Sequence, residues 1–212
     1  MPWLTQSRFP FLWNCFQWAI GGTVDKRRLC LRHYSGQKRV LEVGCSVGNI
    51  AVAFKGTAGL RYVGIDIDPA AIALAKKRFA RFDNFSFRCQ NLAQAVELGE
   101  QFDYVLLAGV LHHLPDQESL SLVHAAQRLL DERGLLVVVE PVTPAAGDSS
   151  FLRFYLRTLE QGQHVRDPAT LGRLLNSVRG LLPCGEETCL VGATPLGVPR
   201  CARFGVWQFR GD

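Results

Sequence analysis

Between residues 38 and 142 the chain alternates short apolar runs with longer amphipathic stretches. Apolar runs of about four to eight residues are typical of buried strands, and apolar positions about three or four apart are typical of helices. The pattern predicts strands at Arg39–Val43, Arg61–Ile65, Phe85–Cys89, Tyr104–Leu107 and Leu135–Glu140. It predicts helices at Asn49–Lys55, Pro69–Phe82, Leu92–Leu98 and Glu118–Leu130. Continuous apolar strands between helices favour a parallel sheet with helices on both faces.

The two ends of the chain follow other patterns. Phe9–Ile20 has apolar residues at helical spacing, Gly21-Gly22 would end that helix, and a second short helix is predicted around Asp25–Tyr34. Beyond Glu140 the pattern predicts a helix from Pro168 to Val178 and two strands, Glu187–Val191 and Ala202–Phe209. The prediction is one α/β domain over 1–212, with a seven-stranded, mostly parallel sheet that ends in an antiparallel hairpin. Its parts are an N-terminal helical arm (1–36), a core (38–142), an insertion with a helix (143–183) and the hairpin (184–212).

Composition narrows the partners of this domain. The chain has 212 residues, is 48% hydrophobic and carries a net charge of +5. This mild charge does not predict nucleic-acid binding, and the runs Lys26–Arg28 and Lys76–Arg78 are interpreted as solvated helix faces. Phe9–Ile20 is shorter than the about 20 residues that span a bilayer. We therefore interpret it as a lid or docking helix, with a membrane-surface role as the alternative and no stable membrane insertion.

Cysteine spacing predicts no metal site. The seven cysteines include no Cys-x-x-Cys pair, and no histidine pair near Cys184 and Cys189 completes a zinc site. Reduced, mostly buried thiols in a cytoplasmic protein are the expectation.

A glycine turn after the first strand is the strongest sign of chemistry. Gly44 and Gly48 allow a tight turn in which the backbone approaches a ligand, and the predicted helix from Asn49 would point its first amides at that ligand. Asp66 ends the next strand, where a carboxylate can accept two hydrogen bonds from a ribose diol. The dinucleotide fingerprint G-x-G-x-x-G fails, because Ser46 and Asn49 replace two of its glycines.

Four segments together resemble the class I S-adenosylmethionine-dependent methyltransferases. Glu42-x-Gly44-Cys45-Ser46-x-Gly48 is similar to their first motif, with Ser46 in place of the middle glycine, and Asp66 matches their ribose-binding acid. Phe102–Val105 with Gly109–Asp116 resembles the fourth-strand motif, and Leu129–Pro141 resembles the fifth. The resemblance implies a Rossmann-like sheet with a reversed final strand, S-adenosylmethionine as cofactor, and a small-molecule acceptor.

The resemblance also implies roles for individual residues. Gly44, Cys45, Ser46 and Gly48 would contact the methionine portion, and Glu42 would organise the turn or bind the amino group through water. Asp66 would hold the ribose hydroxyls, Ile67 would pack against adenine, and Asn91, beside Leu92, would meet the adenine amine where the family usually has aspartate. Ala108, with Gly109, would cap the ammonium group.

Fewer residues are candidates for catalysis than for cofactor binding. His112 or His113 could accept a proton if the acceptor must lose one, or could instead help to build the cofactor pocket. Tyr155 could reach an acceptor or could instead be part of the core. Glu140 is expected to be structural, because a strand-end acid often accepts from nearby amides. Other residues that could contact an acceptor or cover it are Arg153, Arg157, His164, Trp13, Phe16 and Trp18.

The leading functional hypothesis is therefore direct in-line methylation of a small metabolite, apolar or acidic, by a monomer or homodimer. The alternatives are an RNA methyltransferase, a non-catalytic module that binds S-adenosylmethionine, and a nicotinamide-dependent oxidoreductase. No Asn/Asp-Pro-Pro-Tyr/Phe motif follows the fourth strand.

Overall fold

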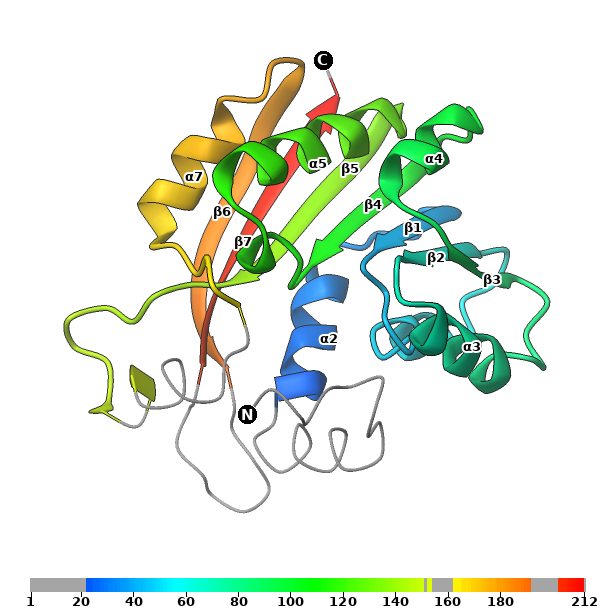
Figure 1. The fold of residues 1–212 in the computed structure, drawn as a ribbon, viewed down its shortest axis with the longest axis horizontal. Coiled ribbons are helices and arrows are strands. Elements are labelled where there is room, and N and C mark those ends of the chain that lie inside the picture. Colours follow the sequence, from blue (N-terminus) through cyan, green and yellow to red (C-terminus); the bar gives the residue numbers. More distant parts are fainter. Residues whose placement is uncertain (1–21, 151, 154–161, 192–201, 212) are drawn as a thin grey trace.

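A computed structural model describes residues 22–150, 152–153, 162–191 and 202–211. In this part of the chain, seven strands form one sheet in the order β3-β2-β1-β4-β5-β7-β6 (Figure 1). Neighbours pair in parallel from β3 to β5, and β7 pairs antiparallel with both β5 and β6. The predicted α/β class and the reversed terminal hairpin are confirmed. The strands are β1 (Arg39–Val43), β2 (Arg61–Asp66), β3 (Phe85–Cys89), β4 (Phe102–Ala108), β5 (Leu130–Pro141), β6 (Leu181–Val191) and β7 (Ala202–Gly211).

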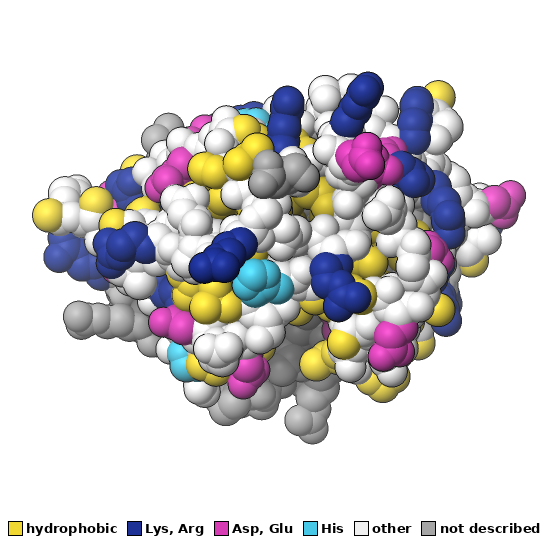
Figure 2. All heavy atoms as spheres, turned by 90° about the horizontal axis from the view of Figure 1, so that it is seen from above, with side chains coloured by type: hydrophobic (Ala, Val, Ile, Leu, Met, Phe, Trp, Pro, Cys, Tyr) yellow, Lys and Arg dark blue, Asp and Glu magenta, His cyan; other side chains and the backbone are white. Residues whose placement is uncertain are grey.

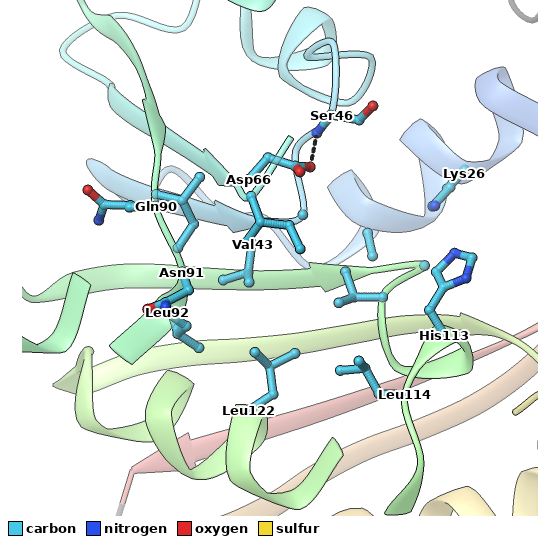
Figure 3. A pocket seen from close by; sticks show the side chains of 16 residues that line it. Lys26, Val43, Ser46, Asp66, Gln90, Asn91, Leu92, His113, Leu114 and Leu122 are labelled. Atoms are coloured by element: carbon cyan, nitrogen blue, oxygen red, sulfur yellow. Dashed lines mark hydrogen bonds between the residues drawn. The ribbon is translucent and has the colours of Figure 1, made fainter. Parts of the chain in front are cut away.

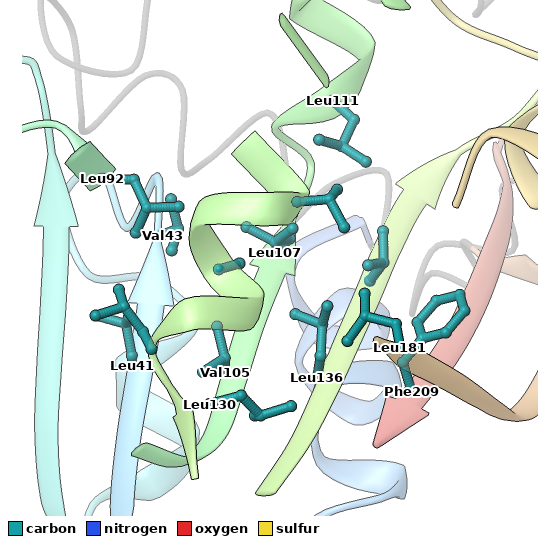
Figure 4. Packing of buried hydrophobic residues seen from close by; sticks show 14 of the residues in the cluster. Leu41, Val43, Leu92, Val105, Leu107, Leu111, Leu130, Leu136, Leu181 and Phe209 are labelled. Atoms are coloured by element: carbon teal, nitrogen blue, oxygen red, sulfur yellow. The ribbon is translucent and has the colours of Figure 1, made fainter. Parts of the chain in front are cut away.

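Helices cover both faces of the sheet, as predicted, and each face has its own buried core. One core packs α2 and α3 against the sheet, and the other packs α4, α5 and α7. In the second core Leu41, Val105 and Leu136 from three neighbouring strands lie beneath α5 (Figure 4). The helical elements are α2 (Gly22–Arg32), the 3-10 turn η1 (Ala51–Phe54), α3 (Pro69–Arg78), α4 (Leu92–Glu97), the 3-10 turn η2 (Leu111–His113), α5 (Asp116–Arg128) and α7 (Pro168–Asn176).

The predicted helix Asn49–Lys55 is wrong. Only the four-residue η1 forms there, because Ile50, Ala51 and Phe54 are drawn into the core and the chain then turns at Gly56 with φ +81°. No helix N-terminus therefore points from this segment at the glycine turn.

Two other helix boundaries also differ from the prediction. α3 ends at Arg78 rather than at Phe82, because Phe79 leaves the helix to stack on Phe85, with ring centroids 4.9 Å apart. α5 ends at Arg128, and Gly134 lies inside β5, where a Cβ would come within 2.7 Å of Leu130. The lack of a side chain at Gly134 thus leaves room for the Leu130 side chain within β5.

The thiols are less buried than predicted. Of the described cysteines, Cys30 and Cys45 are buried, Cys189 is intermediate, and Cys89 and Cys184 are exposed. All of these described cysteines are free thiols. The edge strand β6 also begins earlier than predicted, at Leu181.

Candidate active site

A cavity of about 510 Å³ lies at the carboxyl ends of β1, β2 and β4. Figure 3 shows Lys26 and His113 at one end of it, Asn91 and Leu92 at the other, and Asp66 between them. Ligands of open parallel sheets bind at this edge. Of the residues predicted to bind cofactor, Gly44, Ser46, Asp66, Ile67, Asn91, Leu92, Ala108 and Gly109 line the cavity, whereas Glu42, Cys45 and Gly48 do not.

The glycine turn is a left-handed backbone segment. Gly44, Ser46 and Gly48 have φ values of +72°, +47° and +73°. A Cβ at Gly44 would lie 2.6 Å from Val110, so this glycine lets the turn approach the loop after β4. A Cβ at Gly48 would lie 2.9 Å from Phe79. The second glycine therefore serves core packing rather than direct contact with a ligand.

Asp66 connects the turn to β2. Its carboxylate oxygens accept hydrogen bonds from the backbone amides of Ser46, at 2.8 Å, and Asp68, at 2.9 Å. An ionised carboxylate has about four acceptor positions, so two remain for a diol. Ile67 follows directly, is 76% exposed and lines the cavity, which gives an apolar surface beside the carboxylate.

Asn91 has a structural task that the sequence did not reveal. Its side-chain oxygen accepts a hydrogen bond from the backbone amide of Gln94, and its backbone amide donates to the side-chain oxygen of Gln94, both at 2.9 Å. This capping box begins α4. If the adenine amine also donated to the Asn91 side-chain oxygen, that oxygen would accept two hydrogen bonds, one from adenine and one from the Gln94 amide.

Glu42 lies beneath the turn and outside the cavity lining. It is buried, and its carboxylate accepts a hydrogen bond from the Tyr62 hydroxyl. Burial raises the pKa of Glu42 to about 8, against the opposing effects of Tyr62 and Lys26. Of the two predicted roles, this position supports organising the turn.

Glu140 organises the loop that follows β4. Its carboxylate accepts from the backbone amides of Val110 at 2.7 Å, Leu111 at 2.8 Å and His112 at 3.2 Å, and from the His112 ring. Burial by itself raises the pKa of Glu140, but His112 and the amides outweigh it, so the pKa lies below its usual value. The structural role expected for this acid is confirmed.

The two adjacent histidines occupy different environments. His112 is buried, and Nδ1 of its ring lies 2.7 Å from Glu140 Oε2. His113 is exposed, lines the cavity and packs against His112 with ring centroids 4.0 Å apart. His113 is thus the histidine that lines the cavity, and the buried His112 ring packs against it.

Sequence reasoning missed Lys26 as a site residue. Lys26 lines the cavity, and its Nζ lies so close to Gly109 that a Cβ there would come within 2.2 Å of it. Arg27 donates to the Asn49 carbonyl, and Arg78 donates to Val47 and Asn49. The interpretation of Lys26–Arg28 as a solvated helix face is therefore wrong for Lys26 and Arg27, which are partly buried. Lys76–Arg78 is exposed on α3, as predicted, although Arg78 also reaches the turn.

Arg166, a buried arginine, was also missed. It donates to the carbonyl of Leu111, the first residue of η2, and to the carbonyl of Leu114, which follows the turn. A single arginine in a polar stretch carries no periodic signal, and its partners are about fifty residues away along the chain, so the sequence could not reveal it.

The remaining candidates are only partly described. Arg153 is exposed and donates to the carbonyls of Ala146 and Asp148, and the His164 amide donates to the His112 carbonyl at 2.9 Å. The predictions for Tyr155, Arg157, Trp13, Phe16 and Trp18, and for the first helix of the arm, lie outside the described residues.

A seven-stranded sheet with this order defines a Rossmann-like α/β fold, and the cavity lies at the carboxyl edge of its parallel strands. Residues 41–136 match the family model described as a methyltransferase domain. Over these residues the chain is similar to a methyltransferase domain, and solved structures that share its fold include methyltransferases with bound SAM or S-adenosyl-l-homocysteine.

The curated relatives and several solved structures of similar fold are also methyltransferases by name. The chain is 32% identical over 120 residues to a demethylmenaquinone methyltransferase of Tropheryma whipplei (strain Twist), a match that covers 57% of this chain and 48% of the relative. The chain thus spans about half the length of the curated relatives it matches.

Two solved structures illustrate the shared fold. N-methyltransferase NodS from Bradyrhizobium japonicum WM9, with S-adenosyl-l-homocysteine, superposes with a TM-score of 0.62 at 21% identity, covering 89% of this chain and 85% of that one. Human N-acetylserotonin methyltransferase, with SAM, gives 0.67 at 19% identity, covering 92% and 55%. Within the described residues, no helix is both long and apolar enough to cross a bilayer.

Proposed function

We propose that this protein transfers the methyl group of S-adenosylmethionine directly to a small-molecule acceptor. The observation that carries the proposal is the cavity at the carboxyl ends of β1, β2 and β4, with an acid at its middle and a lysine at one end. Cofactor and acceptor would meet at the end formed by Lys26, Gly109 and His113.

The lining fits the parts of the cofactor in order. Asp66 would accept from both ribose hydroxyls, and Ile67 with Leu92 would enclose the adenine. At the opposite end, Lys26 Nζ would pair with the carboxylate of the methionine portion, a charge-assisted contact of the stronger kind. Gly44 and Gly109, without side chains, would leave room for this portion along the backbone.

The chemistry requires little from the protein beyond placement. When bound, the cofactor supplies a methyl group that its sulfonium makes electrophilic. The chain's own residues would hold the acceptor in line and exclude water, which can supply about 7–11 kcal/mol of the barrier. His113 would take a proton from an acceptor that must lose one, and His112 and Glu140 would fix the position of that ring.

A small organic acceptor is supported by two kinds of evidence. The relative and solved structures named above act, by their names, on demethylmenaquinone and N-acetylserotonin or as an N-methyltransferase. In addition, Lys/Arg and Asp/Glu side chains are interspersed on the face seen in Figure 2, which presents no continuous basic surface for RNA on that side.

The experiment that tests the proposal has two stages. Calorimetry should detect binding of S-adenosylmethionine and S-adenosylhomocysteine, and NADH should not bind in their place. Methyl transfer from radiolabelled cofactor would then be measured on a panel of quinols, phenols, amines and carboxylic acids, with total RNA as a separate arm. No binding at near-millimolar cofactor would overturn the proposal, transfer to RNA would replace the acceptor class, and binding without any transfer would support a non-catalytic module.

A further inference from the structure

Arg166 lies immediately before α7 and is one of the few charged residues buried in the described chain, at 8% exposure. Its guanidinium donates to the Leu111 carbonyl at 3.0 Å, to the Leu114 carbonyl at 2.7 Å and to the His164 carbonyl at 3.0 Å. It also contacts the Asp116 carboxylate at 2.8 Å and the Ser119 hydroxyl at 3.3 Å. The planar fork of an arginine can hold several acceptors in a fixed arrangement, which a lysine cannot.

These contacts complement those of Glu140 on the same segment. Glu140 accepts from the amides of Val110, Leu111 and His112, while Arg166 donates to the carbonyls of Leu111 and Leu114. A short 3-10 turn has few internal hydrogen bonds with which to hold its shape. The η2 turn is therefore held by two buried side chains of opposite charge, one on its amides and one on its carbonyls.

Arg166 also joins the turn to the segment that follows β5. Its own carbonyl accepts from the amide of Thr143 at 3.0 Å, and the nearby His164 amide donates to the His112 carbonyl at 2.9 Å. Removing the Arg166 side chain would free the carbonyls of Leu111 and Leu114 and so loosen the turn, together with the part of the cavity wall formed by His113 and Leu114.

We propose that Arg166 is a positioning residue, which sets the η2 turn so that His113 and Leu114 form the wall of the transfer site. This inference rests on the proposed function for the meaning of that wall. The geometry of the turn itself can be tested without an acceptor.

The test compares Arg166→Lys and Arg166→Met with the same substitutions at Arg173, an exposed arginine on α7 whose side chain donates a hydrogen bond to Thr170. Amide hydrogen exchange is measured by NMR in the full chain, together with the imidazole signals of histidines labelled with nitrogen-15. In Arg166→Lys we expect exchange at Val110, Leu111 and His112 to quicken at least tenfold, while amides of β4 and β5 keep wild-type rates. The His113 signal should shift and its response to S-adenosylhomocysteine should change, with His33 and His124 as internal references.

The outcomes separate this inference from the proposed function. Wild-type exchange in both Arg166 variants would overturn it, and so would acceleration spread evenly over the sheet, which indicates a purely structural role. If Arg166→Met fails to fold, Arg166→Lys alone decides between these outcomes. Failure of the wild-type protein to bind S-adenosylhomocysteine would instead overturn the proposed function, whatever the exchange pattern.

Discussion

Glu140 Oε2 lies 2.7 Å from His112 Nδ1, and the two side chains are 0% and 8% exposed. The carboxylate comes from the end of β5 and the imidazole from the turn after β4, two neighbouring parallel strands. A buried carboxylate is costly unless its acceptor positions are filled, and here three amides and one ring fill them. The acid therefore determines which way the histidine turn faces.

Replacing this acid should destabilise the protein. Glu140→Gln leaves one acceptor oxygen where the turn offers three amides and a ring nitrogen, so we expect the free energy of unfolding to fall by about 3 kcal/mol. Because the pKa of Glu140 is lowered in the folded state, its stabilisation is present above the usual value of 4.5 and is lost as the pH falls. The deficit measured by urea unfolding should thus be large at pH 7 and shrink near pH 3. Glu132→Gln, at an exposed position of β5, is the control; equal stability of the two variants at pH 7 would contradict the prediction.

Asp66 offers a test of the ribose contact. Asp66→Asn keeps the size of the side chain but loses the anion and one acceptor, so we expect the dissociation constant for S-adenosylhomocysteine to rise at least tenfold while the fold persists. Asp68→Ala is a matched control two residues away. Asp68 caps α3 through the amides of Ala70 and Ala71, so this change should cost about 1 kcal/mol of stability and little affinity. Calorimetry and thermal unfolding of both variants test whether Asp66 contacts the ribose. An unchanged affinity in Asp66→Asn would contradict that role.

Lys26 can be tested by changing the ligand as well as the protein. If its ammonium pairs with the cofactor carboxylate, Lys26→Met should weaken binding of S-adenosylhomocysteine by about tenfold to a hundredfold. Binding of methylthioadenosine, which lacks the carboxylate, should change little. Lys77→Met removes the same charge at an exposed site and is the control. Equal losses for both ligands would instead indicate that Lys26 supports the shape of the cavity.

The strands of the sheet could be predicted because apolar runs and turn residues close by in the sequence mark them. The buried strand Arg39–Val43 and the edge strand Phe85–Cys89 were predicted to the residue, since apolar runs and turn residues mark their ends. The segment after Gly48 could not be predicted in the same way. Its helical periodicity is real, but contacts with distant residues draw it into the core and override the local preference.

The residues of the site also differ in how far the sequence predicts them. Gly44 and Asp66 belong to contiguous motifs, and the structure places both at the cavity. Lys26 and Arg166 reach their partners only through the tertiary fold, across long separations in the chain. When the role of a side chain depends on partners that are distant in the sequence, the residues next to it in the chain do not predict that role.

Glu42 should make stability depend on pH in the opposite direction to Glu140. Burial raises its pKa in the folded state to about 8, above the ordinary value of 4.5, so its protonated form stabilises the fold below 4.5 and that contribution is lost as the pH rises through about 8. Each pH unit of this window is worth up to about 1.4 kcal/mol. Glu42→Gln keeps an oxygen for the Tyr62 hydroxyl and cannot ionise, so its stability relative to wild type should increase steadily from pH 5 to pH 8.5. Urea unfolding across that range measures the difference, with the exposed Glu97→Gln as control; parallel profiles for wild type and Glu42→Gln would show that Glu42 is already ionised in the folded protein at pH 5.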